Sequence, residues 1–436
     1  MTGALTKDGA RTARDPGRSA LGTTAGNAAR DAFRRVQRHF SPAVALAGKF
    51  AGQGAAEAAA SGAEITLTDG RRMLDFGSYA VTLLGHRHPA VTEAVRRQLD
   101  AMPVSSRSLV NPVTAEAAER LSEHLGGRLR RVYFGVNGSD AVEVAVKLAR
   151  LASGRPRVLA VRGAFHGKSL GALALTHHGR FRAGLEPVLP HATHLDPRDP
   201  DAVRRACAEG DVAAVVFEPV QGENGVVPLD PGVLARWCED AHAAGAFAIA
   251  DEIQTGLRRA GEPSLALHAG LPVDAVLLGK PLGGGVVPIS AAVCSDELYR
   301  PLLDDPFRHS ATFAGQPLCA AAVPAALAAV EGLAGQGETI SGRLRAGLAE
   351  LRRTHPDAVT GTRGRGLLWG VDFASPELSG EVQIGLAQRG LLVSPCLSRP
   401  ETLRLLPPLV ATRADVERAF DALSAAVGAA AVEVSR

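Results

Sequence analysis

Two residues that could act together in catalysis, Asp251 and Lys280, each come at or just after the end of a short apolar run. The runs cover residues 246–250 and 275–278. Runs of this length and composition predict buried strands of a parallel sheet, and open α/β folds place their chemistry at the carboxyl ends of such strands. We therefore expect the carboxylate and the amine to face one cleft.

A carboxylate and an amine in one cleft suit an enzyme that uses pyridoxal 5'-phosphate (PLP). The lysine forms a Schiff base with the aldehyde of PLP, and an acid keeps the pyridine nitrogen protonated. A lysine released by a substrate amine can then move protons, because burial readily lowers the pKa of an ammonium group. The simpler alternative is a pair of unrelated polar residues at strand ends, since a fold-level pattern alone does not carry function.

The sequence around both residues, ADEIQTG and LLGKPLGGGVVP, resembles the class III aminotransferases (ω-aminotransferases) of the fold type I PLP-dependent enzymes. Further matches fall in the same order along most of the chain. The resemblance implies an α/β fold in which residues 76–318 form a large PLP-binding domain with a mostly parallel central sheet. Residues 319–436 would form a small α+β domain to which residues 31–75 contribute, and residues 1–30 would be a disordered tail.

The resemblance also implies which residues bind PLP. Lys280 matches the Schiff-base lysine and Asp251 the acid beneath the pyridine nitrogen. Gly138 and Ser139 lie where a turn meets a helix, so free backbone N–H groups and the helix dipole favour the cofactor phosphate there. An ordinary N-cap by Ser139 or Asp140 is the alternative. The other implied cofactor-binding residues are Phe165 and Ile253 on the ring, Gln254 at its phenolic oxygen, His166, Glu218 and Thr312.

The match at Thr312 bears on the oligomeric state, because the corresponding residue of the family binds the cofactor phosphate of the neighbouring subunit. The resemblance therefore predicts a homodimer whose two active sites are each completed by the partner.

Four residues match positions that contact substrate in the family. Tyr79 matches a tyrosine of ornithine-type members, and Lys168 stands where members that use 2-oxoglutarate usually have arginine. Lysine does not replace the bidentate fork of arginine. Glu223 and Arg404 match a glutamate–arginine pair of the family. In that pair the glutamate either masks the arginine or moves away, so that the arginine can bind an α-carboxylate. The alternative for this pair is a simple interdomain salt bridge.

These matches predict a PLP-dependent aminotransferase that moves an amino group from an ω-amino or diamino-type donor to a 2-oxo acid. Lys168 and the altered loop at 258–260 motivate a second hypothesis: racemisation, β- or γ-elimination or replacement, or C–C bond formation on the same cofactor. A third hypothesis, a PLP-fold protein that only binds or regulates, is disfavoured because Lys280, Asp251, Gln254 and Thr312 are all present.

The composition of the chain limits which partners, targeting signals and metal sites we expect. The chain has 436 residues and a net charge of +3, which is too small to indicate a nucleic-acid partner. We expect no membrane span, and no secretory signal within residues 1–30, although an Arg-rich transit peptide is an alternative reading of that segment. His86 and His88 have no third ligand nearby, so we expect no metal. The five cysteines form no metal-like cluster and favour a reducing cytoplasm.

Overall fold

The computed structural model describes residues 17–106 and 108–434. The chain divides into two compact units, which we describe separately. One unit comprises the chain up to Ala59 together with Ile65–Met73, and the other comprises Ala60–Glu64 and Leu74–Arg436. A disordered tail was predicted over residues 1–30, and its first 16 residues lie outside the described residues. From Gly17 onward the chain is helical, where the sequence predicted disorder.

The first unit contains the helices α1 (Gly17–His39) and α2 (Pro42–Ala51). Ser41 starts α2 by accepting a hydrogen bond from the backbone of Ala43, and Pro42 occupies the first turn, where no N–H is needed. The strands β1 (Glu57–Ser61), β2 (Glu64–Leu67) and β3 (Arg72–Phe76) run across the boundary between the units. A tight turn at Asp69-Gly70 joins β2 to β3, with Gly70 at φ +85°.

The first sheet of the second unit has the strand order β4-β12-β11-β10-β7-β5-β6. Its strand β10 (Phe247–Asp251) runs parallel to both neighbours, and β12 runs antiparallel to both of its own. The predicted apolar runs thus form adjacent buried strands of a mostly parallel sheet, as expected. The other strands are β4 (Arg131–Gly135), β5 (Arg157–Val161), β6 (Ala192–Leu195), β7 (Val212–Phe217), β11 (Ala275–Leu278) and β12 (Ser290–Cys294).

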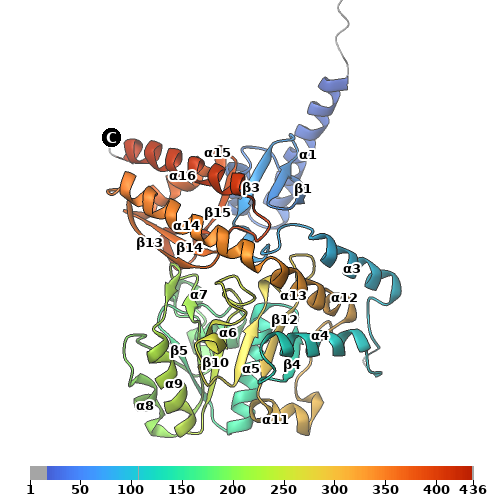
Figure 1. Ribbon diagram of the computed structural model, residues 1–436, viewed down its shortest axis with the longest axis vertical. Helices are drawn as coiled ribbons and strands as arrows, with labels where there is room; N and C mark the ends of the chain where they lie inside the picture. The colour runs from blue at the N-terminus through green and yellow to red at the C-terminus, as the bar shows by residue number, and fades with distance from the viewer. Residues whose placement is uncertain (1–16, 107, 435–436) are drawn as a thin grey trace, which may run out of the picture. The chain divides into compact units, whose positions relative to one another are not determined.

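Helices pack on this first sheet (Figure 1). The helix α5 (Gly138–Ser153) contacts several of the strands, and α9 (Pro231–Ala243) packs on β10 and β7. Trp237 of α9 is fully buried and donates its indole N–H to the backbone oxygen of Asp199. The shorter helices are α6 (Leu170–Leu175), α7 (Gly179–Arg182), α8 (Ala202–Ala206), α10 (Leu265–His268) and α11 (Asp296–Asp304).

A second sheet in this unit contains, in spatial order, β3, β15 (Leu391–Cys396), β16 (Arg399–Leu405), β14 (Leu368–Phe373) and β13 (Val359–Arg365). The strands β15 and β16 form a hairpin that is closed by Leu397 and Ser398. Trp369 of β14 is buried. The helices α14 (Ala334–Thr354), α15 (Pro376–Gln388) and α16 (Arg413–Val434) accompany this sheet (Figure 1).

Three helices pack together elsewhere in the second unit, namely α3 (Pro89–Ala101), α4 (Pro112–His124) and α13 (Ala322–Gly332). Helix α13 also contacts the 3₁₀ turn η4 (Lys280–Gly283). The remaining short elements are α12 (Pro317–Ala320), β8 (Val220–Gln221), β9 (Val227–Pro228), η1 (Ser78–Ala80), η2 (Glu186–Val188), η3 (Cys207–Glu209) and η5 (Pro306–Arg308).

Within the described residues no single helix has both the length and the apolar composition needed to cross a membrane. One bent pair, Pro317–Gly332 with Ala334–Thr354, meets these two criteria when taken together.

Candidate active site

A cavity of about 360 Å³ opens at the carboxyl end of the first sheet. Asp251 is the last residue of β10, Glu218 follows β7 directly, and Lys280 comes two residues after β11. The parallel alignment of these strands brings the three side chains to one edge. The residues that line the cavity are Asn137, Gly138, Ser139, Phe165, His166, Gly167, Glu218, Glu223, Asp251, Ile253, Gln254 and Lys280.

Asp251 is held by two partners inside the cavity wall. Its Oδ2 lies 2.6 Å from Nδ1 of His166, and its Oδ1 accepts a hydrogen bond from the backbone N–H of Ile253 at 3.1 Å. Burial alone would lower the pKa of His166, but the hydrogen bond to Asp251 and the charges of Asp251 and Glu218 outweigh it and raise this pKa. Asp251 therefore faces the cavity in a fixed orientation, paired with His166.

Glu218 is the second buried carboxyl of the site. Its Oε1 accepts a hydrogen bond from the backbone N–H of Phe165 at 2.8 Å. Burial is the main cause that raises the pKa of Glu218 to about 7, and the neighbouring charge of Asp251 adds to the shift. The site thus holds one carboxylate paired with a histidine and one carboxyl that gains or loses its proton near neutral pH.

Lys280 begins the 3₁₀ turn η4 with a positive φ of 36°, a conformation that side chains other than glycine rarely adopt. Burial lowers its pKa, although the carboxylates of Glu223 and Asp251 oppose the shift. Backbone strain of this kind is common at active sites, where the surroundings enforce it. The lowered pKa favours the neutral amine that a nucleophile or a general base needs.

The amino end of α5 forms one wall of the cavity. Asn137 caps the helix, with its Oδ1 accepting the N–H of Asp140 at 3.1 Å, so the cap is neither Ser139 nor Asp140. The first-turn residues Gly138 and Ser139 line the cavity as predicted anion-binding groups would. Gly167 has φ +128°, and a Cβ there would overlap Oγ of Ser139. Gly167 therefore lets the loop after β5 approach the helix end closely.

Glu223 and Arg404 lie together in the structure although they are far apart in the sequence. Nη1 of Arg404 donates to Oε1 of Glu223 at 2.5 Å and to Oε1 of Gln254 at 3.3 Å. Arg404 is only 2% exposed. Because an unpaired buried guanidinium would be costly, the Glu223 carboxylate neutralises it on the cavity side.

Four residues predicted to bind cofactor or substrate are not among those that line the cavity of their own chain, namely Arg404, described above, and Tyr79, Lys168 and Thr312. Tyr79 is 75% exposed and lies in the left-handed turn η1, which contacts η4. The ammonium of Lys168 lies over two aromatic rings, 4.6 Å from the centre of Phe181 and 5.9 Å from that of Phe165. Thr312 is exposed on a loop that follows η5.

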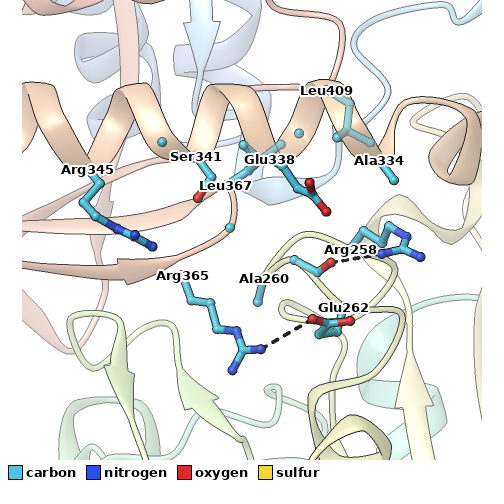
Figure 2. A pocket seen from close by; sticks show the side chains of 14 residues that line it. Arg258, Ala260, Glu262, Ala334, Glu338, Ser341, Arg345, Arg365, Leu367 and Leu409 are labelled. Atoms are coloured by element: carbon cyan, nitrogen blue, oxygen red, sulfur yellow. Dashed lines mark hydrogen bonds and ion pairs between the residues drawn. The ribbon is translucent and has the colours of Figure 1, made fainter.

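The altered loop at 258–260 borders a different cleft, of about 280 Å³, shown in Figure 2. Leu257 and Arg258 both have positive φ. Arg258 forms a two-pronged ion pair with Glu331 of α13, with its shortest distance at 2.6 Å. Arg365 reaches into the same cleft toward Glu262, at 3.6 Å. The positive charge that Arg258 adds to this loop is thus neutralised by Glu331, outside the cofactor cavity.

Two lining residues were not among the predicted ligands. Asn137 belongs to the NGSD turn and Gly167 follows His166, so both lie beside predicted residues. The positive φ of Gly167 is the physical reason that a glycine stands there, and the dipeptide His-Gly in the loop after β5 was the available signal. Among the described residues no group of three or more His, Cys, Asp or Glu side chains is arranged to hold a metal ion.

Comparison with known proteins shows which family and which solved structures this chain resembles. The model of the family "Aminotransferase class-III" matches residues 54–427. An ornithine aminotransferase from Toxoplasma gondii ME49 is 31% identical, with a TM-score of 0.81 over 88% of this chain and 92% of that chain. An amine transaminase from an uncultivated Pseudomonas species, solved in its PLP-bound form, is 28% identical, with a TM-score of 0.79 over 86% and 95% of the two chains. An S-selective transaminase from Arthrobacter sp. is 25% identical, with a TM-score of 0.79 over 86% and 93%.

Proposed function

Because this chain belongs to the class III aminotransferases and is a PLP-dependent enzyme of that family, we propose that its amino donor carries an ω-amino group and its acceptor is a 2-oxo acid. The observation that carries this proposal is the buried Glu223–Arg404 pair at the wall of the Lys280 cavity. Similarity to an ornithine aminotransferase and to an amine transaminase supports the same substrate class.

The residues of the cavity fit PLP. The amino end of α5 offers backbone N–H groups for a phosphate, Asp251 offers a carboxylate for a ring nitrogen, and Lys280 offers an amine of lowered pKa for an aldehyde. A volume of about 360 Å³ is within the usual range for a small-molecule site. We propose that Gly138, Ser139, Phe165, His166, Glu218, Asp251, Ile253, Gln254 and Lys280 hold the cofactor.

PLP, when bound, supplies an aldehyde that bonds to amines and a ring that withdraws electrons from the substrate carbon. We propose that Asp251 keeps the proton on the ring nitrogen. His166 orients this carboxylate through its Nδ1 contact of 2.6 Å. We propose that Nζ of Lys280 takes the proton from the substrate carbon and returns it, which requires the neutral amine that its lowered pKa favours.

We propose that Glu223 and Arg404 choose which end of a substrate enters. While Glu223 masks Arg404, this guanidinium is not free to bind a carboxylate, so a donor with an ω-amino group and no carboxylate next to it is accepted. When Glu223 moves away, Arg404 can bind the α-carboxylate of an amino or oxo acid. This exchange allows one pocket to serve both half-reactions.

We also propose a homodimer in which Thr312 reaches the partner's cofactor phosphate. The loop segments at residues 102–106 and 108–111 lie beside the loop at residues 305–316, because the backbone N–H of Ser105 donates to Oε1 of Gln316 at 2.7 Å. Exposed apolar side chains gather on these loops, namely Met102, Val104, Leu109, Val110, Phe307 and Phe313. An exposed group of this kind is typical of a protein interface.

Sedimentation tests the dimer, and Thr312→Val tests the shared site. The variant is expected to remain dimeric and to bind PLP more weakly. A monomeric wild-type protein that binds PLP tightly would contradict the proposal.

We retain residues 76–318 and 319–436 as the proposed large and small domains, with residues 31–75 contributing to the small one. The two sheets support this division, since the first uses strands between Arg131 and Cys294 and the second uses mainly strands after Val359. We propose the reducing cytoplasm as the site of action, which the free state of all five cysteines supports.

The proposed reaction is tested with the purified PLP-loaded protein and a panel of ω-amines, diamines and α-amino acids, without any oxo acid. The first half-reaction is expected to bleach the visible absorbance of the cofactor and to release one carbonyl product per active site. A 2-oxo acid added afterwards should restore the absorbance. Amine consumption without a carbonyl product would mean that the enzyme performs another PLP reaction.

A further inference from the structure

The turn between β15 and β16 touches Glu223 through its backbone. The N–H of Leu397 donates to Oε2 of Glu223 at 3.0 Å, and the N–H of Ser398 donates to the backbone oxygen of Glu223 at 3.1 Å. Sγ of Cys396 lies 3.5 Å from the backbone oxygen of Gly222. The segment that carries Glu223 is therefore docked along the end of the hairpin.

The same hairpin holds Arg404 independently of Glu223. Arg404 lies in β16 opposite Ser394, and its Nη2 donates to the backbone oxygen of Pro395 at 3.0 Å. Its Nη1 also reaches Oε1 of Gln254. If the Glu223 side chain leaves, Arg404 keeps these two contacts and stays in place. Its buried Nε has no partner among the described residues, so the guanidinium retains capacity for a further acceptor.

The two oxygens of Glu223 therefore have different partners. Oε1 faces Arg404 and Gln254, whereas the hydrogen bond recorded for Oε2 comes from the backbone of Leu397. An N–H that donates to a carboxylate is among the stronger hydrogen bonds in proteins. Moving Glu223 away from Arg404 requires this bond to break, whatever happens at the arginine.

We propose that the turn Leu397–Ser398 is a latch that holds Glu223 over Arg404, and that the backbone N–H of Leu397 is a positioning group that sets the enzyme's preference between ω-amines and α-carboxylates. This inference rests on the proposed role of Glu223 and Arg404. A weaker latch frees Arg404 more often, so α-amino acids and 2-oxo acids bind better, while ω-amines lose the masked pocket that they need.

Leu397→Pro removes the N–H. Leu397 does not have a positive φ, which proline cannot adopt, and Cys396 before it is in an extended strand, which a residue before proline favours. Leu397→Ala is the matched control, because it shortens the side chain and keeps the N–H. Equal thermal midpoints of the two variants show that both are folded to the same degree.

The first measurement is the ratio of kcat/KM for L-alanine to kcat/KM for n-butylamine. The proline variant is expected to raise this ratio about tenfold over the alanine variant, which corresponds to about 1.4 kcal/mol and to the loss of one hydrogen bond to a charged group. The change should lie in KM, with kcat nearly constant, because the latch acts on binding. The same ratio in both variants would overturn the proposal.

The second measurement needs no turnover and no proline variant. Hydrogen exchange of the Leu397 amide is followed in the PLP-loaded wild-type protein and in Glu223→Ala. The amide is expected to be protected in the wild type and to exchange at least tenfold faster in the variant. Adding pyruvate, which carries an α-carboxylate, should speed exchange in the wild type, whereas n-butylamine should not.

If neither Glu223→Ala nor pyruvate changes the exchange rate of the Leu397 amide, the latch is refuted. If no amine yields a carbonyl product with any variant, the proposed reaction fails instead. The exchange experiment distinguishes the two failures, because it reports on the latch alone.

Discussion

Replacing Glu218 by glutamine should make the protein less sensitive to pH. Burial raises the pKa of this carboxyl from its ordinary 4.5 to about 7. The folded state therefore holds the proton more tightly than the unfolded state. The resulting stability is fully present below about pH 4.5 and is lost as the pH rises toward 7.

The size of this loss follows from the two pKa values. One unit of pKa shift corresponds to about 1.4 kcal/mol, and most of the window between 4.5 and 7 lies above pH 5. Going from about pH 5 to pH 7 should cost the wild-type protein about 2 kcal/mol of unfolding free energy through this one group. Glutamine keeps an oxygen for the N–H of Phe165 and has no proton to lose, so Glu218→Gln should avoid this cost.

The assay is urea unfolding of the protein stripped of PLP at a fixed protein concentration, because ligand binding and association both shift the apparent stability. At pH 5 the variant and the wild type should have similar unfolding free energies. At pH 7 the variant should be the more stable by about 2 kcal/mol. Glu381→Gln, which removes an exposed carboxylate on α15, is the control. Its unfolding free energy should differ from that of the wild type by the same amount at both pH values. A difference between Glu218→Gln and wild type that does not change with pH would refute the reasoning.

Other substitutions test the cofactor wall and the strained loop. Lys280→Ala should prevent borohydride from fixing PLP to the chain, and the mass of the intact protein shows whether it does. Gly167→Ala should raise the Kd for PLP about tenfold, because its positive φ and the overlap with Ser139 disturb the phosphate wall; an unchanged Kd in fluorescence titration would argue against that role. Arg258→Gly and Arg258→Ala both lose the ion pair with Glu331, but alanine keeps a Cβ at φ +63°. The glycine variant should thus be the more stable by about 1 kcal/mol in thermal unfolding, and equal midpoints would contradict this.

The strands that carry Asp251 and Lys280 were predictable because a short apolar run followed by one polar residue is a strong local signal. The close approach of Glu223 and Arg404 was expected only through resemblance, since no local pattern links residues so far apart. The left-handed backbone at Leu257 and Arg258 could not be anticipated, because neither residue favours it and tertiary contacts such as the Glu331 ion pair impose it.

The contact between Leu397 and Glu223 lay beyond prediction for a different reason. It uses a backbone N–H, which every residue except proline has, so the side chains of the turn give no sign of it. The position of Lys168 over aromatic rings likewise depends on Phe181, which comes from a different element.

The two tryptophans of the chain are divided between the two sheets of the second unit. Trp237 is buried against the first sheet, and Trp369 lies within the second. Replacing either one by phenylalanine would leave a single tryptophan inside one half of this unit, and its emission can be excited selectively at long wavelength. Its emission would then report on the melting of that half alone, so a comparison of the two variants would show whether the cofactor sheet and the Arg404 sheet lose their structure together or in sequence.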